Sequence, residues 1–139
     1  LIYGMGMEHG KKHLVKAAME GVIYRLYSIY LAMREVNGQE VRSIRANGGY
    51  IRSLPWMQIQ ADVFGAEITV PKVKEASALG AAYTAMLAVG KVSDLRQGLP
   101  AMGPERTILP NLRNHEIYRE CYARAQEVYG RVYPETKLS

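Results

Sequence analysis

Cysteine is almost absent from the sequence: Cys121 is the only one among 139 residues. A single thiol cannot form a disulfide within the chain, which excludes a disulfide-stapled miniprotein and fits a reducing cytoplasmic compartment. The longest nearly uncharged stretch, residues 76–90, is shorter than the roughly 18–20 residues that span a bilayer. We also find no signal peptide, Asn-x-Ser/Thr acceptor, low-complexity tract or internal repeat. We therefore expect a globular, cytoplasmic protein with no membrane partner.

Positive charge is in excess but is not concentrated. The sequence contains 18 Lys and Arg residues against 13 Asp and Glu residues, a formal net charge of +5. Such an excess favours a phosphate-bearing ligand or a nucleic acid as partner. The basic residues are dispersed without a dense stripe, so we expect a solvated basic surface and no nucleic-acid partner. The three His residues and the one Cys are also scattered, and we expect no metal site from them.

Composition and length indicate one folded domain. Hydrophobic residues make up 48% of the chain and charged residues 22%, which is typical of soluble globular proteins. The chain begins at Leu1, without an initiator Met and inside an apolar segment. We therefore expect it to be a piece of a longer protein.

Hydrophobic periodicity and turn residues predict an α/β fold. The expected elements, in chain order, are a helix over 10–36, a strand over 41–46, a Gly-Gly turn at 47–49, a helix from Ser53 to Phe64, a strand over 67–70, a helix over 76–89 and a helix over 114–133. Asn37-Gly38 and Gly65 are the expected helix stops, and Ser53 is the expected N-cap, with Pro55 in the first turn. Residues 99–113 are expected to form a loop because of their Pro and Gly content.

Two of these helices carry packing patterns. The apolar residues of the first helix recur at spacings of three and four and predict the face that packs on the core: Val15, Ala18, Met19, Val22, Leu26, Ile29 and Met33. The segment Leu79-Gly80-Ala81-Ala82, with three small residues, predicts that the helix over 76–89 packs closely on the sheet.

Three ligand-binding motifs are only partly matched, and we exclude them. Gly10-Lys11-Lys12 lacks the upstream glycine and the Ser or Thr of a P-loop. A zinc-binding HExxH motif beginning at His115 would need a second histidine where Arg119 stands. Gly4-Met5-Gly6 neither follows a full strand nor completes the dinucleotide-binding pattern GxGxxG.

The most informative segment is the predicted strand that leads into Gly48-Gly49 and then into a helix. A strand, two glycines and a helix N-terminus bring exposed backbone N–H groups together, which suits a phosphate or the edge of a nucleotide. The same pattern also occurs as an ordinary tight turn. The residues alone leave both interpretations open.

A resemblance to a known family favours the first interpretation. The segments that carry it are residues 8–21 (EHGKKHLVKAAMEG), 44–53 (IRANGGYIRS), 56–65 (WMQIQADVFG) and 75–83 (EASALGAAY). In this order they resemble the C-terminal domain of the FGGY carbohydrate kinases. The resemblance extends over about residues 4–92.

The resemblance implies an actin-like, ribonuclease-H-type α/β domain that binds ATP or ADP, with Mg²⁺, in a sugar kinase. It implies that Gly49 packs its backbone against the adenosine, that Gly48 keeps the loop free of a side chain, and that Ser53 contacts the adenine. Tyr50 and Arg52 depart from the small residues often found at their positions, and Ser53 supplies a hydroxyl in place of an amide.

The resemblance also implies which parts of the enzyme lie outside the chain. The family's catalytic Asp and its N-terminal domain are expected upstream of Leu1, so we assign no catalytic residue here and expect the fragment to be inactive. We divide the fragment into a core (1–98), a loop (99–113) and a C-terminal helix with its tail (114–139). The expected acceptor is a sugar or sugar acid, gluconate first and xylulose second. The alternatives are a non-catalytic actin-like nucleotide-binding or interaction module and a basic interaction domain, and homo-oligomer formation stays open.

We expect structural roles for the other polar residues of these segments. Asp62 and Glu75 are expected to hold loops by accepting backbone N–H bonds. Glu20 is expected to make a buried hydrogen bond to a loop. The remaining residues are expected to pack (Trp56, Gln58 and Gln60) or to lie at the surface or cap a helix (His9 and His13).

Overall fold

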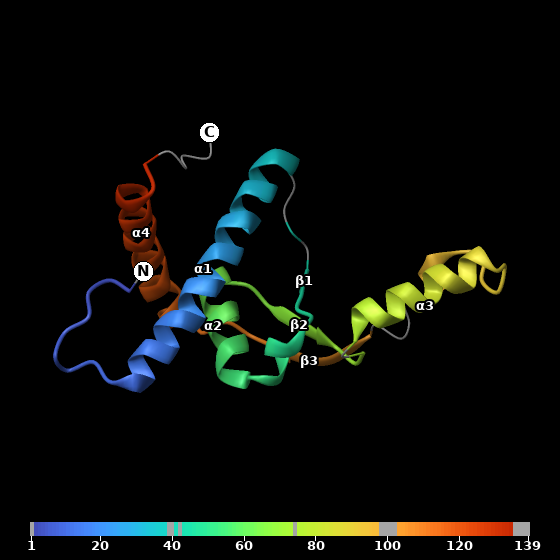
Figure 1. The fold of residues 1–139 in the computed structure, drawn as a ribbon, viewed down its shortest axis with the longest axis horizontal. Coiled ribbons are helices and arrows are strands. Elements are labelled where there is room, and N and C mark those ends of the chain that lie inside the picture. The colour runs from blue at the N-terminus through green and yellow to red at the C-terminus, as the bar shows by residue number, and fades with distance from the viewer. Residues whose placement is uncertain (1, 39–40, 42, 74, 98–102, 135–139) are drawn as a thin grey trace.

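The computed structural model describes residues 2–38, 41, 43–73, 75–97 and 103–134, which form an α/β fold (Figure 1). Its elements, in chain order, are α1 (Lys11–Asn37), β1 (Ile44–Arg45), the 3₁₀ turn η1 (Gly49–Arg52), α2 (Leu54–Phe64), β2 (Ile68–Pro71), α3 (Ala76–Ala88), β3 (Pro104–Ile108) and α4 (Leu112–Val132). The α/β prediction and the four expected helices are therefore confirmed. No helix in the described part of the chain is long and apolar enough to cross a membrane.

The sheet has the strand order β1-β2-β3. β1 and β2 are parallel, with Ile44 opposite Ile68, and are joined through η1 and α2 as a crossover connection. β3 is antiparallel to β2, with Arg106 opposite Val70. The strand expected over 41–46 is shorter than predicted, although the backbone N–H of Ala46 still donates to the carbonyl of Thr69. Position 42 of that expected strand lies outside the described residues.

β3 lies in a segment that was expected to be a loop. Residues 98–102 lie outside the described part of the chain, and Pro104–Ile108 pairs with β2. In this short strand Arg106 occupies a position on the same sheet face as Ile108, which packs against the core. An arginine on the core face hides the apolar alternation from which a strand would be predicted. The following helix, α4, begins at Leu112, two residues before its expected start.

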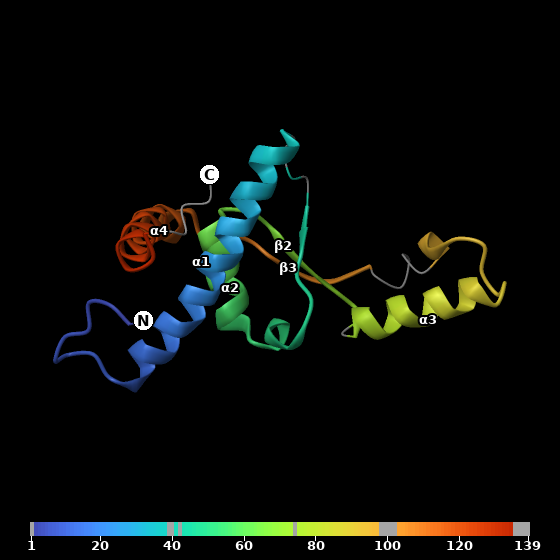
Figure 2. The same ribbon diagram turned by 45° about the horizontal axis from the view of Figure 1, so that its top comes forward.

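Helix α2 lies at the centre of the fold (Figure 2). One cluster of buried side chains lies between α2 and the sheet and contains Ala46, Ile51, Met57, Ala61, Ile68 and Val70. A second cluster joins α2 to α1 and α4 and contains Ile23, Ile59, Val63 and Tyr118. The helix ends where expected, at Gly65, whose φ of 61° is the left-handed conformation that glycine adopts without strain.

Helix α1 turns a different face to the core than its periodicity predicts. Ile23 is fully buried, and Tyr24 and Tyr27 pack against the same cluster. Of the face expected to be buried, only Met19 packs against the core, and the larger of its other members are exposed: Val15, Val22, Leu26, Ile29 and Met33. The helix therefore has two apolar faces, and the one containing tyrosines contacts α2 and α4. The predicted core face is wrong.

Helix α3 extends away from the other elements (Figures 1 and 2). It buries none of its residues. The expectation that the segment Leu79-Gly80-Ala81-Ala82 lets this helix pack closely on the sheet is therefore wrong for this chain. The positions of small residues indicate only where a close approach is sterically allowed.

Candidate functional site

The Gly48-Gly49 loop follows β1 and leads into η1. Gly48 has φ = 103°, a backbone conformation that residues with a Cβ rarely adopt. The conformation of the loop therefore requires glycine at this position. Gly49 is different, because its φ is negative and a Cβ built on it would meet no atom within 4 Å. The fold of the described chain therefore does not explain the absence of a side chain at Gly49. An exposed, unobstructed stretch of backbone is what a ligand needs for close approach.

Ser53 is the N-cap residue of α2, as expected from the sequence. Its backbone N–H donates to the carbonyl of Tyr50 at 3.0 Å, and its own carbonyl accepts from Met57 at 3.0 Å. Its side chain makes no capping hydrogen bond. The first turn of α2 also has no acidic residue, so the positive end of this helix dipole is not neutralised locally. The Ser53 hydroxyl is thus available beside a helix N-terminus.

Tyr50 and Arg52, the two residues after Gly49 that are larger than the sequence comparison suggested, each contact a different element. The Tyr50 hydroxyl donates to Oε1 of the buried Gln60 at 3.1 Å, and the Tyr50 ring meets Trp56 edge-on, with 5.6 Å between ring centroids. Burial raises the pKa of Tyr50, although the hydrogen bond to Gln60 acts in the opposite direction. Nη2 of Arg52 lies 3.9 Å from the carboxylate of Glu75, and both side chains are exposed. Tyr50 is thus directed toward α2, and Arg52 toward the start of α3.

Asp62 is a buried residue near the C-terminal end of α2 that accepts several hydrogen bonds. It is 2% exposed, and its carboxylate accepts hydrogen bonds from the backbone N–H of Asn111, from Nδ2 of Asn114 and from Nε2 of Gln58, at 2.8–2.9 Å. Asn111 is the N-cap of α4 and accepts from Arg113 and Asn114 through its own side chain. The expectation that Asp62 holds a loop through a backbone N–H is confirmed, and the carboxylate ties the start of α4 to α2.

The other polar residues have mixed outcomes. Glu20 accepts a hydrogen bond from the Tyr118 hydroxyl at 2.9 Å, so its partner is a helix and not the expected loop. Glu75 is the N-cap residue of α3, where its side chain makes no capping hydrogen bond, and its carboxylate lies 3.9 Å from Arg52. His9 and His13 each accept a backbone N–H through Nδ1, from Gly6 and Gly10 respectively, which confirms a local capping role for His13 at the start of α1.

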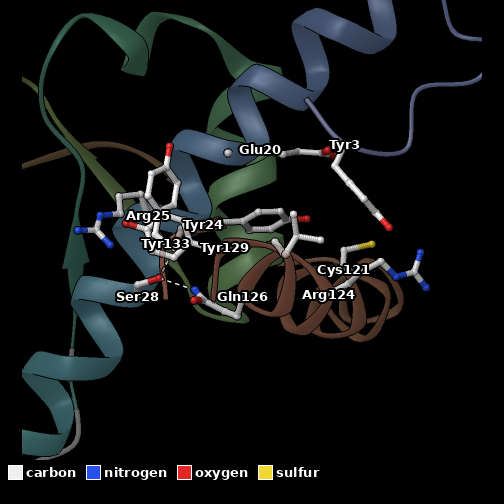
Figure 3. Close-up of a pocket in the computed structure, with 13 residues that line it drawn as sticks. Tyr3, Glu20, Tyr24, Arg25, Ser28, Cys121, Arg124, Gln126, Tyr129 and Tyr133 are labelled. Atoms are coloured by element: carbon white, nitrogen blue, oxygen red, sulfur yellow. Dashed lines mark hydrogen bonds between the residues drawn. The ribbon is translucent and has the colours of Figure 1, made fainter. Parts of the chain in front are cut away.

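Two further features of the structure could not be predicted from the sequence. The first is Arg106, whose Nη2 donates to the carbonyl of Ile51 at 2.9 Å and so reaches η1 from β3. The second is a cavity of about 520 Å³ between α1 and α4 (Figure 3). Ser28 and Gln126 are hydrogen-bonded at its wall, and Arg25 and Arg124 lie at opposite ends of it. The cavity shares no residue with the Gly48-Gly49 loop.

No group of three or more His, Cys, Asp or Glu residues that could hold a metal ion occurs within the described ranges. Mg²⁺ in nucleotide sites is usually held by one or two carboxylates together with the phosphates. Because the phosphates complete such a site, the described residues alone do not define one, and we assign no reaction step in this chain to a metal.

Comparison with known proteins shows which family this chain resembles in sequence and in fold. A family model described as the FGGY family of carbohydrate kinases, C-terminal domain, matches residues 1–89. The chain is similar to the gluconokinase of Bacillus licheniformis, with 37% identity over 118 residues that cover 85% of this chain and 23% of that protein.

Two solved structures extend the similarity to the fold. One is a xylulose kinase from Brucella ovis, with a TM-score of 0.81 and 27% identity over 95% of this chain and 27% of that one. The other is the glycerol kinase of Plasmodium falciparum, solved with ADP, with a TM-score of 0.72 and 27% identity over 91% of this chain and 26% of that one. The chain spans about a quarter of the length of the relatives it matches. The expected actin-like α/β fold is confirmed.

Proposed function

This chain belongs to the FGGY family of carbohydrate kinases and carries its C-terminal domain, and from that membership we propose that the Gly48-Gly49 loop binds the adenosine of ATP in a sugar kinase. The observation that carries the proposal is the open backbone of Gly49, which the fold itself does not require to be glycine. The family's chemistry, the transfer of phosphate to a sugar, needs a nucleotide site on this domain or its neighbour.

The residues around Gly49 can supply the contacts of an adenosine. A purine and its ribose can lie flat against the backbone at Gly49, because glycine has no Cβ and no other described atom lies within 4 Å of the Cβ position. The Ser53 hydroxyl can donate or accept one hydrogen bond at the base edge. Tyr50 contributes through its ring packing behind the loop, and Arg52 remains exposed at the rim. The site therefore recognises a nucleotide mainly by shape and by a few polar contacts.

We infer that the chain works as one part of a longer kinase. Phosphoryl transfer depends on positioning and charge stabilisation from both sides of the reacting phosphate, and the loop provides a single wall. The exposed apolar residues of α1, such as Val22 and Ile29, support this inference, because a face of this kind is normally covered. The family's catalytic base and N-terminal domain would then lie upstream. The isolated chain, mixed with ATP, Mg²⁺ and sugars, is expected to give no phosphorylated product.

Gluconate is the first proposed acceptor of the complete kinase, and xylulose is the second. The similarity to the gluconokinase of Bacillus licheniformis supports the first, and the xylulose kinase of Brucella ovis supports the second. Since the described residues contain no identified sugar contact, the choice is tested on the complete enzyme. A panel of sugars and sugar acids, with phosphorylated product measured for each, decides between the two.

The nucleotide site is tested by Gly49→Val. The added side chain has room in the free protein, so the melting temperature should stay close to that of the parent, while ADP affinity should fall by about tenfold or more, which is about 1.4 kcal/mol. Gly130→Val on α4 is the matched control, because its Cβ also meets no atom within 4 Å. Calorimetric titration with millimolar ADP provides the readout. Unchanged affinity in Gly49→Val would show that the assigned site is wrong.

The same titration decides the alternative, a non-catalytic interaction module. In this alternative, the exposed apolar face of α1 would contact a separate partner and not another domain of the same kinase. A parent chain without any ADP affinity at millimolar concentration supports this alternative over the nucleotide site.

A further inference from the structure

Arg106 reaches the nucleotide loop from a strand that is distant in sequence. It lies on β3 opposite Val70, which is buried against α2, so both residues belong to the core face of the sheet. From there the guanidinium donates through Nη2 to the carbonyl of Ile51 at 2.9 Å. Ile51 is 4% exposed and lies in η1, two residues after Gly49 and two before Ser53. The contact therefore holds the middle of the segment that contains the proposed nucleotide contacts.

The Arg106 guanidinium is partly buried and donates to a backbone carbonyl. Nε of Arg106 is buried and has no hydrogen-bond partner among the described residues. A hydrogen bond from a charged donor is stronger than a neutral one, and it is stronger still where water is excluded. Arg106 is thus held partly out of water with the Ile51 carbonyl as its acceptor.

The other hydrogen bonds that hold η1 lie within the turn itself or come from α2. Within the turn, Ile51 donates to Gly48 at 3.3 Å. From α2, Gln60 accepts the Tyr50 hydroxyl. Among the described residues, the Arg106 contact is the hydrogen bond that joins η1 to β3. Without it, η1 would be held by the buried Ile51 side chain, by the Arg52–Glu75 ion pair, by the bond to Gln60 and by its own short hydrogen bonds.

We propose that Arg106 is a positioning residue for the nucleotide: by holding the Ile51 carbonyl, it sets the position of the Gly49 backbone and of Ser53. This inference rests on the proposed nucleotide site. Arg106 touches no substrate in it and acts only through η1. This role would also make β3 functional, because the strand carries the Arg106 guanidinium and lies at the opposite edge of the sheet from β1, which leads into the loop.

The test compares Arg106→Met and Arg106→Lys with the parent chain. Methionine keeps much of the apolar stem that lies over the core but removes every donor, whereas lysine keeps the charge and a donor. Arg124→Met, an exposed arginine of α4, is the matched control. Amide hydrogen exchange in η1 and calorimetric titration with ADP are measured on all four proteins. The exchange readout needs no nucleotide, so it reports on the contact separately from the proposed site.

We expect Arg106→Met to speed exchange at the Ile51 and Ser53 amides by about tenfold, to leave the amides of β2 unchanged, and to weaken ADP binding by about tenfold. Arg106→Lys should recover part of both effects, and the control should match the parent. Unchanged exchange in η1 would overturn the proposal, as would faster exchange with unchanged ADP affinity. A global rise in exchange in Arg106→Met that Arg106→Lys does not reverse would also overturn it, because the arginine would then be a general stabilising residue. If the parent binds no ADP, the nucleotide site fails and the positioning role fails with it, while the exchange data still show whether Arg106 holds the loop.

Discussion

Helices α2 and α3 have similar apolar character but very different surroundings. α3 contains no charged residue over Ala76–Ala88, yet it buries none of its residues. α2 contains Asp62 and two glutamines and buries six residues. The apolar content of a helix therefore does not determine whether it becomes part of the core. What distinguishes the two is position.

The connection of each helix to the sheet explains the difference. α2 joins two parallel strands, β1 and β2, so the crossover lays it across one face of the sheet. α1 and α4 then cover its other side. α3 follows β2 and precedes the antiparallel β3, so the chain leaves the sheet and returns without crossing its face (Figure 1). The same side chains can be core residues in one location and surface residues in the other.

The largest expected effect is the loss of stability on truncating Met57 of α2, compared with the same truncation of Met86 in α3. Met57 of α2 is fully buried, and Met57→Ala should lower the free energy of unfolding by about 3 kcal/mol through lost burial and a cavity. Met86 of α3 is 38% exposed, and Met86→Ala should change it by less than about 0.5 kcal/mol. Urea denaturation of both variants measures the difference. Equal losses would contradict the contrast between the two helices.

Replacing one glycine near each helix should give effects of opposite sign. Gly65→Ala at the end of α2 places a Cβ in a left-handed conformation and 2.5 Å from the His115 ring, so it should destabilise the chain by about 2 kcal/mol. Gly80→Ala within α3 has open space and should stabilise by about 0.5–1 kcal/mol. Thermal unfolding monitored by circular dichroism gives the sign of each change. A stabilising Gly65→Ala would mean that His115 does not pack over the end of α2.

The smallest effect concerns Tyr118, a buried tyrosine of α4, and depends on pH. Burial, followed by the hydrogen bond and the charge of Glu20, raises the pKa of Tyr118 above its ordinary value of 10.0. Above pH 10 the unfolded chain loses this proton before the folded chain does, so unfolding releases a proton and stability falls as pH rises. Tyr118→Phe should reduce the loss between pH 9 and pH 11 by up to about 1 kcal/mol. Melting temperatures across this range provide the measurement.

Tyr83→Phe on α3 is the control for the alkaline prediction. The Tyr118→Phe variant also lacks the bond to Glu20, so it should be less stable than the parent at neutral pH by about 1 kcal/mol. An alkaline slope in Tyr118→Phe equal to that of the parent would assign the pH dependence to other residues.

The elements that the sequence predicted correctly are those that depend on local chemistry. Helix α2 lies between its expected N-cap, Ser53, and its expected C-cap, Gly65. The left-handed conformation selects glycine directly at position 65, whereas the Ser53 side chain makes no capping hydrogen bond. The strand β3 and the buried face of α1 were missed because both depend on distant partners. β3 is defined by its pairing with β2, and the buried face of α1 is defined by α2 and α4.

The candidate site divides in the same way. Gly48, Gly49 and Ser53 came from the order of the segments and their resemblance to a family, and their role in nucleotide binding remains a prediction. The structure adds that Gly48 is required by its backbone conformation, whereas Gly49 is open. Arg106 is 55 residues from the carbonyl that it contacts, and no short motif could connect the two.

The sequence by itself determined the α/β class, the helix ends and the family, because each depends on neighbouring residues or on the order of short segments along the chain. Only the tertiary structure decided which helix is buried, which face of α1 meets the core and which side chain donates to the Ile51 carbonyl beside the Gly48-Gly49 loop. Burial and hydrogen bonding between distant segments depend on the path of the chain in space, and residue types along the chain do not specify that path locally.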